Sequence, residues 1–127
     1  MDESQSLSRR ERQIMDILYA ADGGTVNEVQ AALVDAPTDM AVRRLLHILE
    51  EKGHVKRRKR GREFVYVPRQ SKAVAGRKAL SRVLETFFGG AVDDALAAHL
   101  MNNSAKVSPE QLERIQQLID QTRKEGR

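Results

Sequence analysis

The residues best suited to chemistry in this sequence are the basic ones that gather between Lys52 and Arg62. Seven of the chain's 22 Lys and Arg residues lie in this stretch, which holds no Asp or Glu. The rest of the chain carries 15 basic against 18 acidic residues, so the net charge of +4 is concentrated in one short segment. A concentrated positive field attracts anions such as phosphate groups. The stretch therefore predicts an anionic partner.

Arg43 and Arg44, shortly before this stretch, offer a second kind of contact. An Arg guanidinium can form two hydrogen bonds with O6 and N7 of guanine, the commonest specific contact between proteins and DNA. On their own, both arginines would be read as solvated residues of a helix surface. Their position beside the basic stretch favours contacts with base edges or phosphates, to which the neighbouring Met40, Ala41 and His47 would contribute.

Catalytic and metal-binding arrangements are absent from the sequence. His47, His54 and His99 stand at no metal-ligand spacing, and there is no Cys for a thiolate site, a disulfide or a nucleophile. The sequence has no phosphate-binding glycine loop and no nucleophile elbow. Asp93-Asp94 is typical of acids in the first turn of a helix. We therefore expect neither an enzyme nor a bound cofactor or metal.

Two helices are predicted ahead of the arginines. Ser8 with Glu11, and Thr25 with Glu28, have the spacing of capping boxes, which open helices. The second helix is expected to end at the Ala36-Pro37 break. The apolar residues expected to face inward in this second helix are Val29, Ala32 and Leu33.

A third helix is predicted from about Thr38 to Lys52, and it carries both arginines. Thr38 or Asp39 would be its N-cap, and Gly53 would follow its end. Its inward stripe consists of Val42, Leu45, Leu46 and Leu49. The arginines therefore fall on its outer face.

Two strands, at about 54–59 and 63–68, are predicted to form a hairpin around Arg60-Gly61-Arg62, because glycine supplies the positive φ of a tight turn. Lys56, Arg58 and Arg60 share one face of the first strand by alternation. Which face packs against the core stays open. The tip is exposed in either case, where basic residues suit contacts with phosphates or the minor groove.

Three further helices are predicted after Pro68, at residues 71–87, at residues 91–102, and after Ser108-Pro109. About 55 residues bury too little surface to form a stable core alone. Their apolar stripes could dock onto the first half of the chain or pair with a second copy, and we expect pairing. The residues expected to form this dimer are Leu84, Phe87, Phe88, Val92, Leu96, Leu100, Leu112, Ile115 and Ile119.

The order helix–helix–helix–hairpin is that of a winged helix-turn-helix domain, in which the second helix of the pair enters the major groove of DNA. The expected fold is mainly α with a small β-hairpin wing. It comprises a winged helix-turn-helix DNA-binding domain over residues 5–69 and a C-terminal three-helix dimerisation region over residues 70–125. No apolar run reaches the about 20 residues of a membrane span, and the N-terminus has no signal-peptide core. We therefore expect a cytoplasmic protein.

The sequence resembles the BlaI/MecI/CopY family of bacterial transcriptional repressors, the penicillinase repressor type, over about residues 7–68. The residues that carry the resemblance are Leu7-Ser8, Glu11, Met15, Thr25-Val26-x-Glu28-Val29, Val42-Arg43-x-Leu45-Leu46-x-x-Leu49, Lys52-Gly53-x-Val55 and Gly61-Arg62-x-Phe64-x-Tyr66-x-Pro68. The resemblance implies a homodimeric repressor on a palindromic operator, with C-terminal helices that interlock.

The resemblance also implies where DNA would be contacted. Recognition-helix contacts would fall on Met40, Ala41, Arg43 and Arg44. Wing contacts would fall on Arg60 and Arg62. From the hairpin pattern we add Lys56 and Arg58 as expected DNA contacts, and from the helix pattern we add His47.

Three features depart from the family pattern. Ala41 stands where Thr is frequent, and the absence of Cys removes the C-terminal copper site of the copper-responsive members. Ala98-His99 stands where the β-lactam-responsive members are cleaved between Asn and Phe. A sensor or protease that relieves repression is an implied partner, and the inducing signal stays open.

Two other classes of protein compete with a DNA-binding repressor. A winged-helix protein-interaction module without DNA binding would have no reason to keep a wing that attracts phosphate. A small enzyme would need an assembled catalytic site. Double-stranded DNA is therefore the expected partner.

Overall fold

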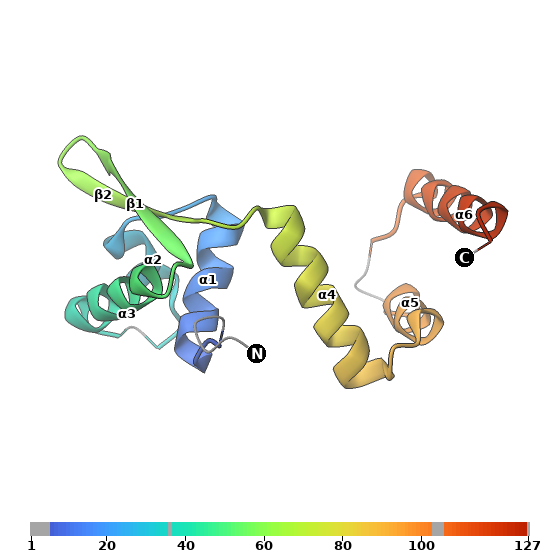
Figure 1. Ribbon diagram of the computed structural model, residues 1–127, viewed down its shortest axis with the longest axis horizontal. Coiled ribbons are helices and arrows are strands. Elements are labelled where there is room, and N and C mark those ends of the chain that lie inside the picture. Colours follow the sequence, from blue (N-terminus) through green and yellow to red (C-terminus); the bar gives the residue numbers. More distant parts are fainter. Residues whose placement is uncertain (1–5, 36, 103–105, 127) are drawn as a thin grey trace. The chain divides into compact units, whose positions relative to one another are not determined.

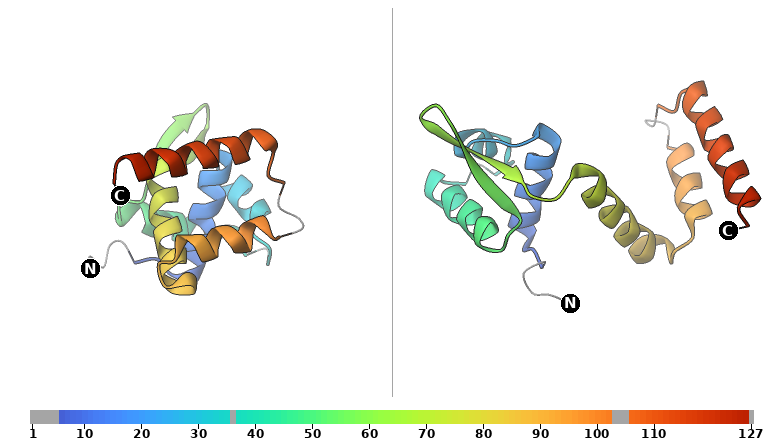
Figure 2. Two further views of the ribbon diagram at one scale, coloured as in Figure 1. Left: turned by 90° about the vertical axis from the view of Figure 1, so that its right-hand side faces the viewer. Right: turned by 45° about the horizontal axis from the view of Figure 1, so that its top comes forward.

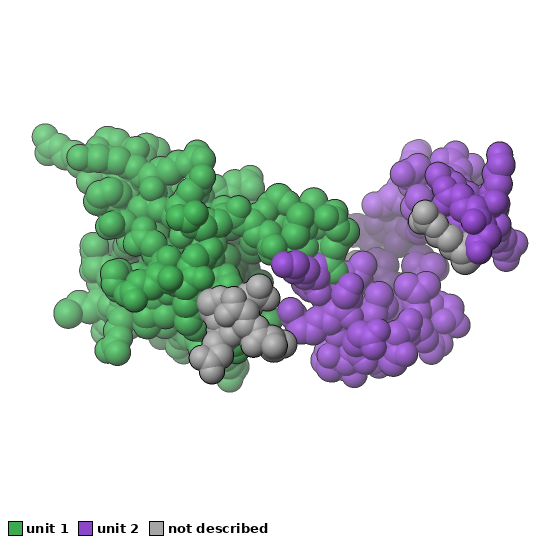
Figure 3. Space-filling model, in the orientation of Figure 1, with its two compact units in different colours: residues 1–77 green, residues 78–127 purple. Residues whose placement is uncertain are grey.

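The computed structural model describes residues 6–35, 37–102 and 106–126. The predicted break at Ala36, and residue 5 at the start of the predicted first domain, lie outside these ranges. The elements in chain order are α1 (Arg9–Ala21), α2 (Val26–Ala32), α3 (Asp39–Glu51), β1 (Val55–Arg60), β2 (Glu63–Pro68), α4 (Lys72–Phe88), α5 (Val92–Leu100) and α6 (Pro109–Lys124) (Figure 1). The chain forms two compact units, a first unit that extends to Arg77 and a second unit that begins at Lys78 (Figure 3).

Reciprocal caps fix the starts of α1 and α2, as the sequence predicted. The Ser8 hydroxyl accepts from the Glu11 amide at 3.1 Å, and the Glu11 carboxylate accepts from the Ser8 amide at 2.7 Å. Thr25 and Glu28 repeat the arrangement at 3.1 and 2.9 Å. Each pair satisfies two amides that have no partner within the helix.

The core of the first unit lies between its three helices and the base of the hairpin. Its buried hydrophobic residues are Ile14, Met15, Leu18, Val26, Val29, Leu33, Val42, Leu46, Leu49, Val55 and Tyr66. Leu45, predicted to face inward, is partly buried and packs against this cluster. The stripe of α3 therefore holds this helix by one face and leaves the opposite face to solvent.

One predicted core position is wrong, because Ala32 is exposed. The inward face of the seven-residue α2 consists instead of Val26 and Val29. Leu33 follows as the C-cap with extended backbone angles, φ −78° and ψ 134°, and its side chain is buried. At about 100° per residue, Ala32 lies to the side of the face that Val26 and Val29 share, so it stays exposed at the end of the helix.

The register of the hairpin decides which of its faces packs on the core. Val55 pairs with Pro68 and Arg57 pairs with Tyr66, and residues directly opposite each other lie on the same face. Val55 and Tyr66 are buried. The face that carries Val55, Arg57 and Tyr66 therefore packs inward at its base, and the face with Lys56 and Arg58 points away. Gly61, with φ 64°, begins a two-residue turn and suits a type II′ hairpin.

A backbone clasp joins the hairpin to the turn after α1. The Gly24 amide donates to the Tyr66 carbonyl at 3.0 Å, and the Tyr66 amide donates to the Gly24 carbonyl at 2.8 Å. Beside it, a Cβ on Gly23 would lie 2.9 Å from Val67 Cγ1, and the φ of Gly23 is 108°. Only glycine permits this approach without strain. Beyond the clasp, the hairpin turn projects away from the three helices (Figure 2).

The last three helices have a different character from the first unit. Helices α4 and α5 confirm the predicted helices, and the capping box of Ser108 with Gln111 opens α6. None of these three helices has a buried residue. The boundary between the compact units falls within α4, whereas the predicted domain boundary lies at Arg69, before this helix.

In the described residues, six helices and one antiparallel hairpin, in the order of a winged helix, confirm the predicted fold class. The winged helix-turn-helix comprises α1 to β2.

Candidate DNA interface

The first turn of α3 is held in place from both sides. The Thr38 hydroxyl caps the helix by accepting from the Ala41 amide at 3.1 Å. The Gln30 side chain of α2 donates to the Pro37 carbonyl at 2.8 Å, which fixes the turn between the two helices. Thr38 is thus the N-cap that the sequence left open between two residues.

The outward face of α3 displays most of the predicted recognition residues. Met40 is 80% exposed, and Arg43, Arg44 and His47 are exposed as well. Ala41 is half-buried beside the core stripe. The first turn of α3 and the hairpin turn lie at the same end of the first unit, on the left in Figure 1.

Two of these outward side chains are paired with acids one helical turn away. Arg43 Nε donates to Asp39 Oδ2 at 2.8 Å, and this carboxylate raises the pKa of Arg43. His47 Nε2 lies 2.6 Å from Glu51 Oε1. The sequence interpretation missed both acids, although their i,i+4 spacing is visible in the sequence.

The hairpin displays the other predicted contacts. Arg58, Arg60 and Arg62 are exposed, and Lys56 is half-buried near the base. Lys59, which the prediction omitted, is also exposed. The exposed cations of the hairpin thus extend along β1 and around the turn, which suits contacts with successive phosphates.

Arg57 has a different role from its basic neighbours. Its guanidinium carbon lies 4.8 Å from the centre of the Phe64 ring, and its Nε lies 3.1 Å from the Glu50 carboxylate of α3. The side chain therefore bridges both strands to the C-terminal end of α3. It sets the angle of the hairpin against the helix rather than adding a free cation.

Lys52 is a second basic residue that is used within the protein. Its Nζ lies 3.0 and 3.1 Å from the two carboxylate oxygens of Glu11, and 3.2 Å from the Ser6 carbonyl. Burial of the Glu11 carboxyl opposes its ionisation, but hydrogen bonds from Ser8 and Lys52 outweigh this, and the pKa of Glu11 is lowered. Lys52 therefore ties α3 to α1, and the basic residues after Val55 carry the surface charge.

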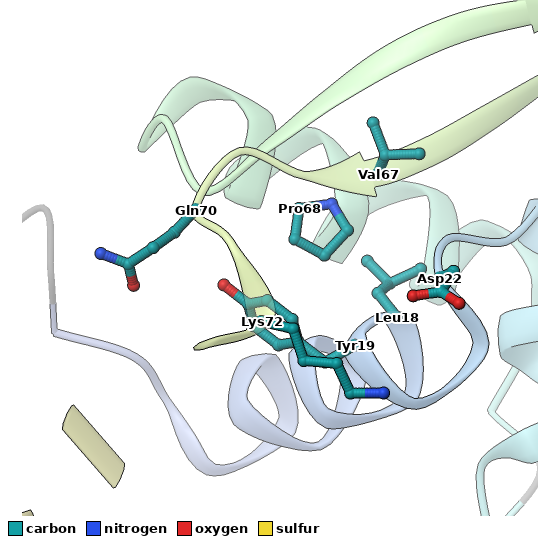
Figure 4. A pocket seen from close by; sticks show the side chains of 7 residues that line it. All are labelled: Leu18, Tyr19, Asp22, Val67, Pro68, Gln70 and Lys72. Carbon is teal, nitrogen blue, oxygen red and sulfur yellow. The ribbon is translucent and has the colours of Figure 1, made fainter. Parts of the chain in front are cut away.

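A small cavity opens where β2 leads toward α4 (Figure 4). Leu18 and Val67 supply its apolar wall, and Asp22, Gln70 and Lys72 bring polar groups to it (Figure 4). Its volume is about 220 Å³. Ligand pockets usually occupy roughly 300–1,000 Å³, so this cavity is small for a ligand site.

The residues predicted to form a dimer are half-buried or exposed. Leu84, Phe88, Leu96 and Ile115 are half-buried. The exposed members of the set are Phe87, Val92, Leu100, Leu112 and Ile119. A groove of about 450 Å³ lies between α5 and α6, with Leu96, Leu100, Val107 and Ile115 in its lining.

Neither a metal site nor a membrane-spanning helix is seen in the part of the chain that the structure describes. Residues 6–35, 37–102 and 106–126 contain no group of three or more His, Asp or Glu side chains placed to hold a metal ion. Among the same residues, no helix has both the length and the apolar character needed to cross a membrane.

A family of known proteins matches most of the chain. The crystal structure of a possible transcriptional regulator for arsenical resistance is similar, with 25% sequence identity, coverage of 70% of this chain and 84% of that chain, and a TM-score of 0.42. No curated protein matches the chain. The model of the penicillinase repressor family matches residues 7–121, which include the whole winged helix and most of α6. The chain therefore belongs to the penicillinase repressor family of DNA-binding transcriptional repressors.

Proposed function

We propose that the chain represses transcription as a homodimer on a palindromic operator, with α3 in the major groove and the hairpin on the flanking backbone. The observation that carries this proposal is the exposed cationic surface of α3 and the hairpin, in a chain of a DNA-binding repressor family. Repression is then steric, because an operator-bound dimer blocks RNA polymerase.

The residues of the interface divide into two roles. Arg43, close to the N-terminal end of α3, reads a base edge, while Met40 and Ala41 offer apolar groups to neighbouring bases. The remaining polar side chains of the interface contact phosphates and fix the register of the protein on DNA. These phosphate contacts are Arg44, His47, Lys56, Arg58, Arg60 and Arg62.

The surface of α4, α5 and α6 supports the proposed homodimer. These helices have no buried residue, although their apolar stripes include Phe87 (74% exposed) and Val92 (64% exposed). Exposed apolar side chains that gather into a contiguous patch mark an interaction site. A partner chain of the same sequence covers it, and a two-fold dimer matches a palindromic operator.

The experiment that tests the function begins with selection of the preferred site from random duplex DNA by the full chain. Arg43→Ala is expected to cost about 1–3 kcal/mol on that site and to relax preference at one base-pair position. Fluorescence titrations against the selected site and a random duplex measure both effects. Equal weakening on the two duplexes would assign Arg43 to a phosphate instead, and failure to select any sequence would refute operator binding.

A further inference from the structure

We propose that Asp39 is a positioning residue, which holds the Arg43 guanidinium in the orientation that reads guanine. The inference rests on the proposed base-reading role of Arg43 and goes beyond it, since it assigns specificity to an acidic residue.

The contact between the two side chains leaves the correct donors available. Asp39 Oδ2 accepts from Arg43 Nε at 2.8 Å. Nε is one corner of a planar group that carries five N–H donors. With Nε occupied, the two terminal nitrogens remain as the pair that can bond O6 and N7 of one guanine.

Exposure keeps this pair accessible to DNA. The side chains of Arg43 and Asp39 are 63% and 46% exposed. A free Arg side chain loses many rotamers when it binds. Because Asp39 already restricts the guanidinium, less conformational entropy is lost when the base contact forms.

The negative charge of Asp39 makes its three possible roles distinguishable by their effects on DNA binding. A carboxylate that faces DNA is repelled by phosphates, so electrostatics alone predicts that its removal strengthens binding to every sequence. A positioning role predicts a loss of binding to the operator only. The third possibility is that Asp39 only stabilises the first turn of α3 through the helix dipole, and this would affect all DNA equally.

The experiment measures, at one salt concentration, the ratio of the affinities of the full chain for its selected operator and for a random duplex of equal length. Asp39→Asn keeps the size of the side chain and removes its charge. We expect Asp39→Asn to lower this ratio by roughly 5-fold or more, a part of the discrimination that one bidentate contact supplies. Binding to random duplex should be unchanged or tighter.

A double-mutant cycle shows whether Asp39 acts through Arg43. In the Arg43→Ala background, Asp39→Asn should change the ratio by less than about 2-fold, because Asp39 then has no guanidinium to position, whereas independent sites would show the full loss in both backgrounds. Glu63→Gln removes an exposed acid beside the hairpin turn and is the control for charge. It should strengthen binding to operator and random duplex by similar factors.

The outcomes separate this inference from the function on which it rests. If Arg43→Ala lowers the ratio and Asp39→Asn leaves or raises it, base reading stands and positioning is wrong. If Asp39→Asn lowers the ratio equally in the Arg43→Ala background, Asp39 acts elsewhere and the inference is also wrong. If Arg43→Ala leaves the ratio unchanged, the proposed base contact itself fails.

Discussion

Arg10 and Asp35 show at the scale of single residues how the turn before α3 is anchored. Asp35 lies in the turn between α2 and α3, and its two carboxylate oxygens accept from Arg10 of α1 at 2.6 Å each. The hydrogen bonds from Arg10 are the main cause that lowers the pKa of Asp35 to about 2. The ionisation of Asp35 therefore reports whether this turn is docked on α1.

A carboxyl titration followed by NMR tests the contact. Arg10→Gln should return the pKa of Asp35 toward its ordinary value of about 3.9. The folded pKa is depressed, so the contribution of the pair to stability is present above that ordinary value and is lost as pH falls toward 2. Arg9→Gln removes the same charge from a residue with only a weak effect on Asp35, and should leave its pKa near 2. An ordinary pKa in the unmodified chain would contradict the contact.

Residue pairs divide into those that sequence spacing reveals and those that it does not. The capping boxes of Ser8 and Thr25 were predicted correctly, because both partners lie within one helical turn. The contact of Lys52 with Glu11 spans 41 positions, so it depends on how α3 packs on α1. The contact of Arg57 with Glu50 is also hidden from sequence spacing, because it depends on how the chain turns from α3 into the hairpin.

At the scale of elements, the hairpin separates its basic residues by function. Arg57 is held by Glu50 and Phe64, whereas Arg60 precedes the exposed turn and Arg62 lies within it. Alternation predicted which basic residues share a face, but not which face is buried. That choice depends on the register of β1 against β2 and on the clasp at Gly24, neither of which is encoded in one strand.

The salt dependence of DNA binding tests the hairpin turn. Each phosphate contact releases about one counterion, so Arg60→Ala with Arg62→Ala should lower the slope of log K against log salt by about two. Binding to operator and to random duplex should weaken alike. Arg123→Ala with Lys124→Ala, in the last turn of α6, removes the same charge far along the chain and should leave the slope intact. An unchanged slope in the hairpin variant would exclude this turn as a contact.

At the scale of the whole molecule, burial is distributed unevenly along the chain. The buried hydrophobic residues of the described chain all lie between Ile14 and Tyr66. Sequence periodicity predicted the last three helices, but a stripe of apolar residues does not say what covers it. What covers these stripes is not encoded in the periodicity of the helices themselves.

Truncation tests the proposal that the winged helix binds DNA and the last three helices form the dimer. A fragment that ends at Arg77 keeps the whole buried core and the hydrogen bond from the Arg69 amide to the His54 carbonyl at 3.0 Å. It should fold as a monomer and bind a full operator at least about 100-fold more weakly than the intact chain, because it loses the gain from linking two sites. Light scattering and titration measure both properties.

The fragment also supplies its own control. On a single half-site, where a second copy adds no contact, fragment and intact chain should differ little in affinity per protomer. An intact chain that is monomeric in solution, or a fragment that binds the full operator as tightly, would contradict the dimer.

The clasp between Gly24 and Tyr66 also sets a gradient of motion along the hairpin. Amide hydrogens near the clasp exchange with solvent only when the core opens, whereas those beside Gly61 are protected by β1–β2 pairing alone. We therefore expect a rigid base of the hairpin and a turn that samples conformations within about nanoseconds to microseconds. In the proposed complex with DNA, Arg60 and Arg62 would follow local variation in groove width without disturbing α3, so one protein surface would tolerate flanking sequences of different shape.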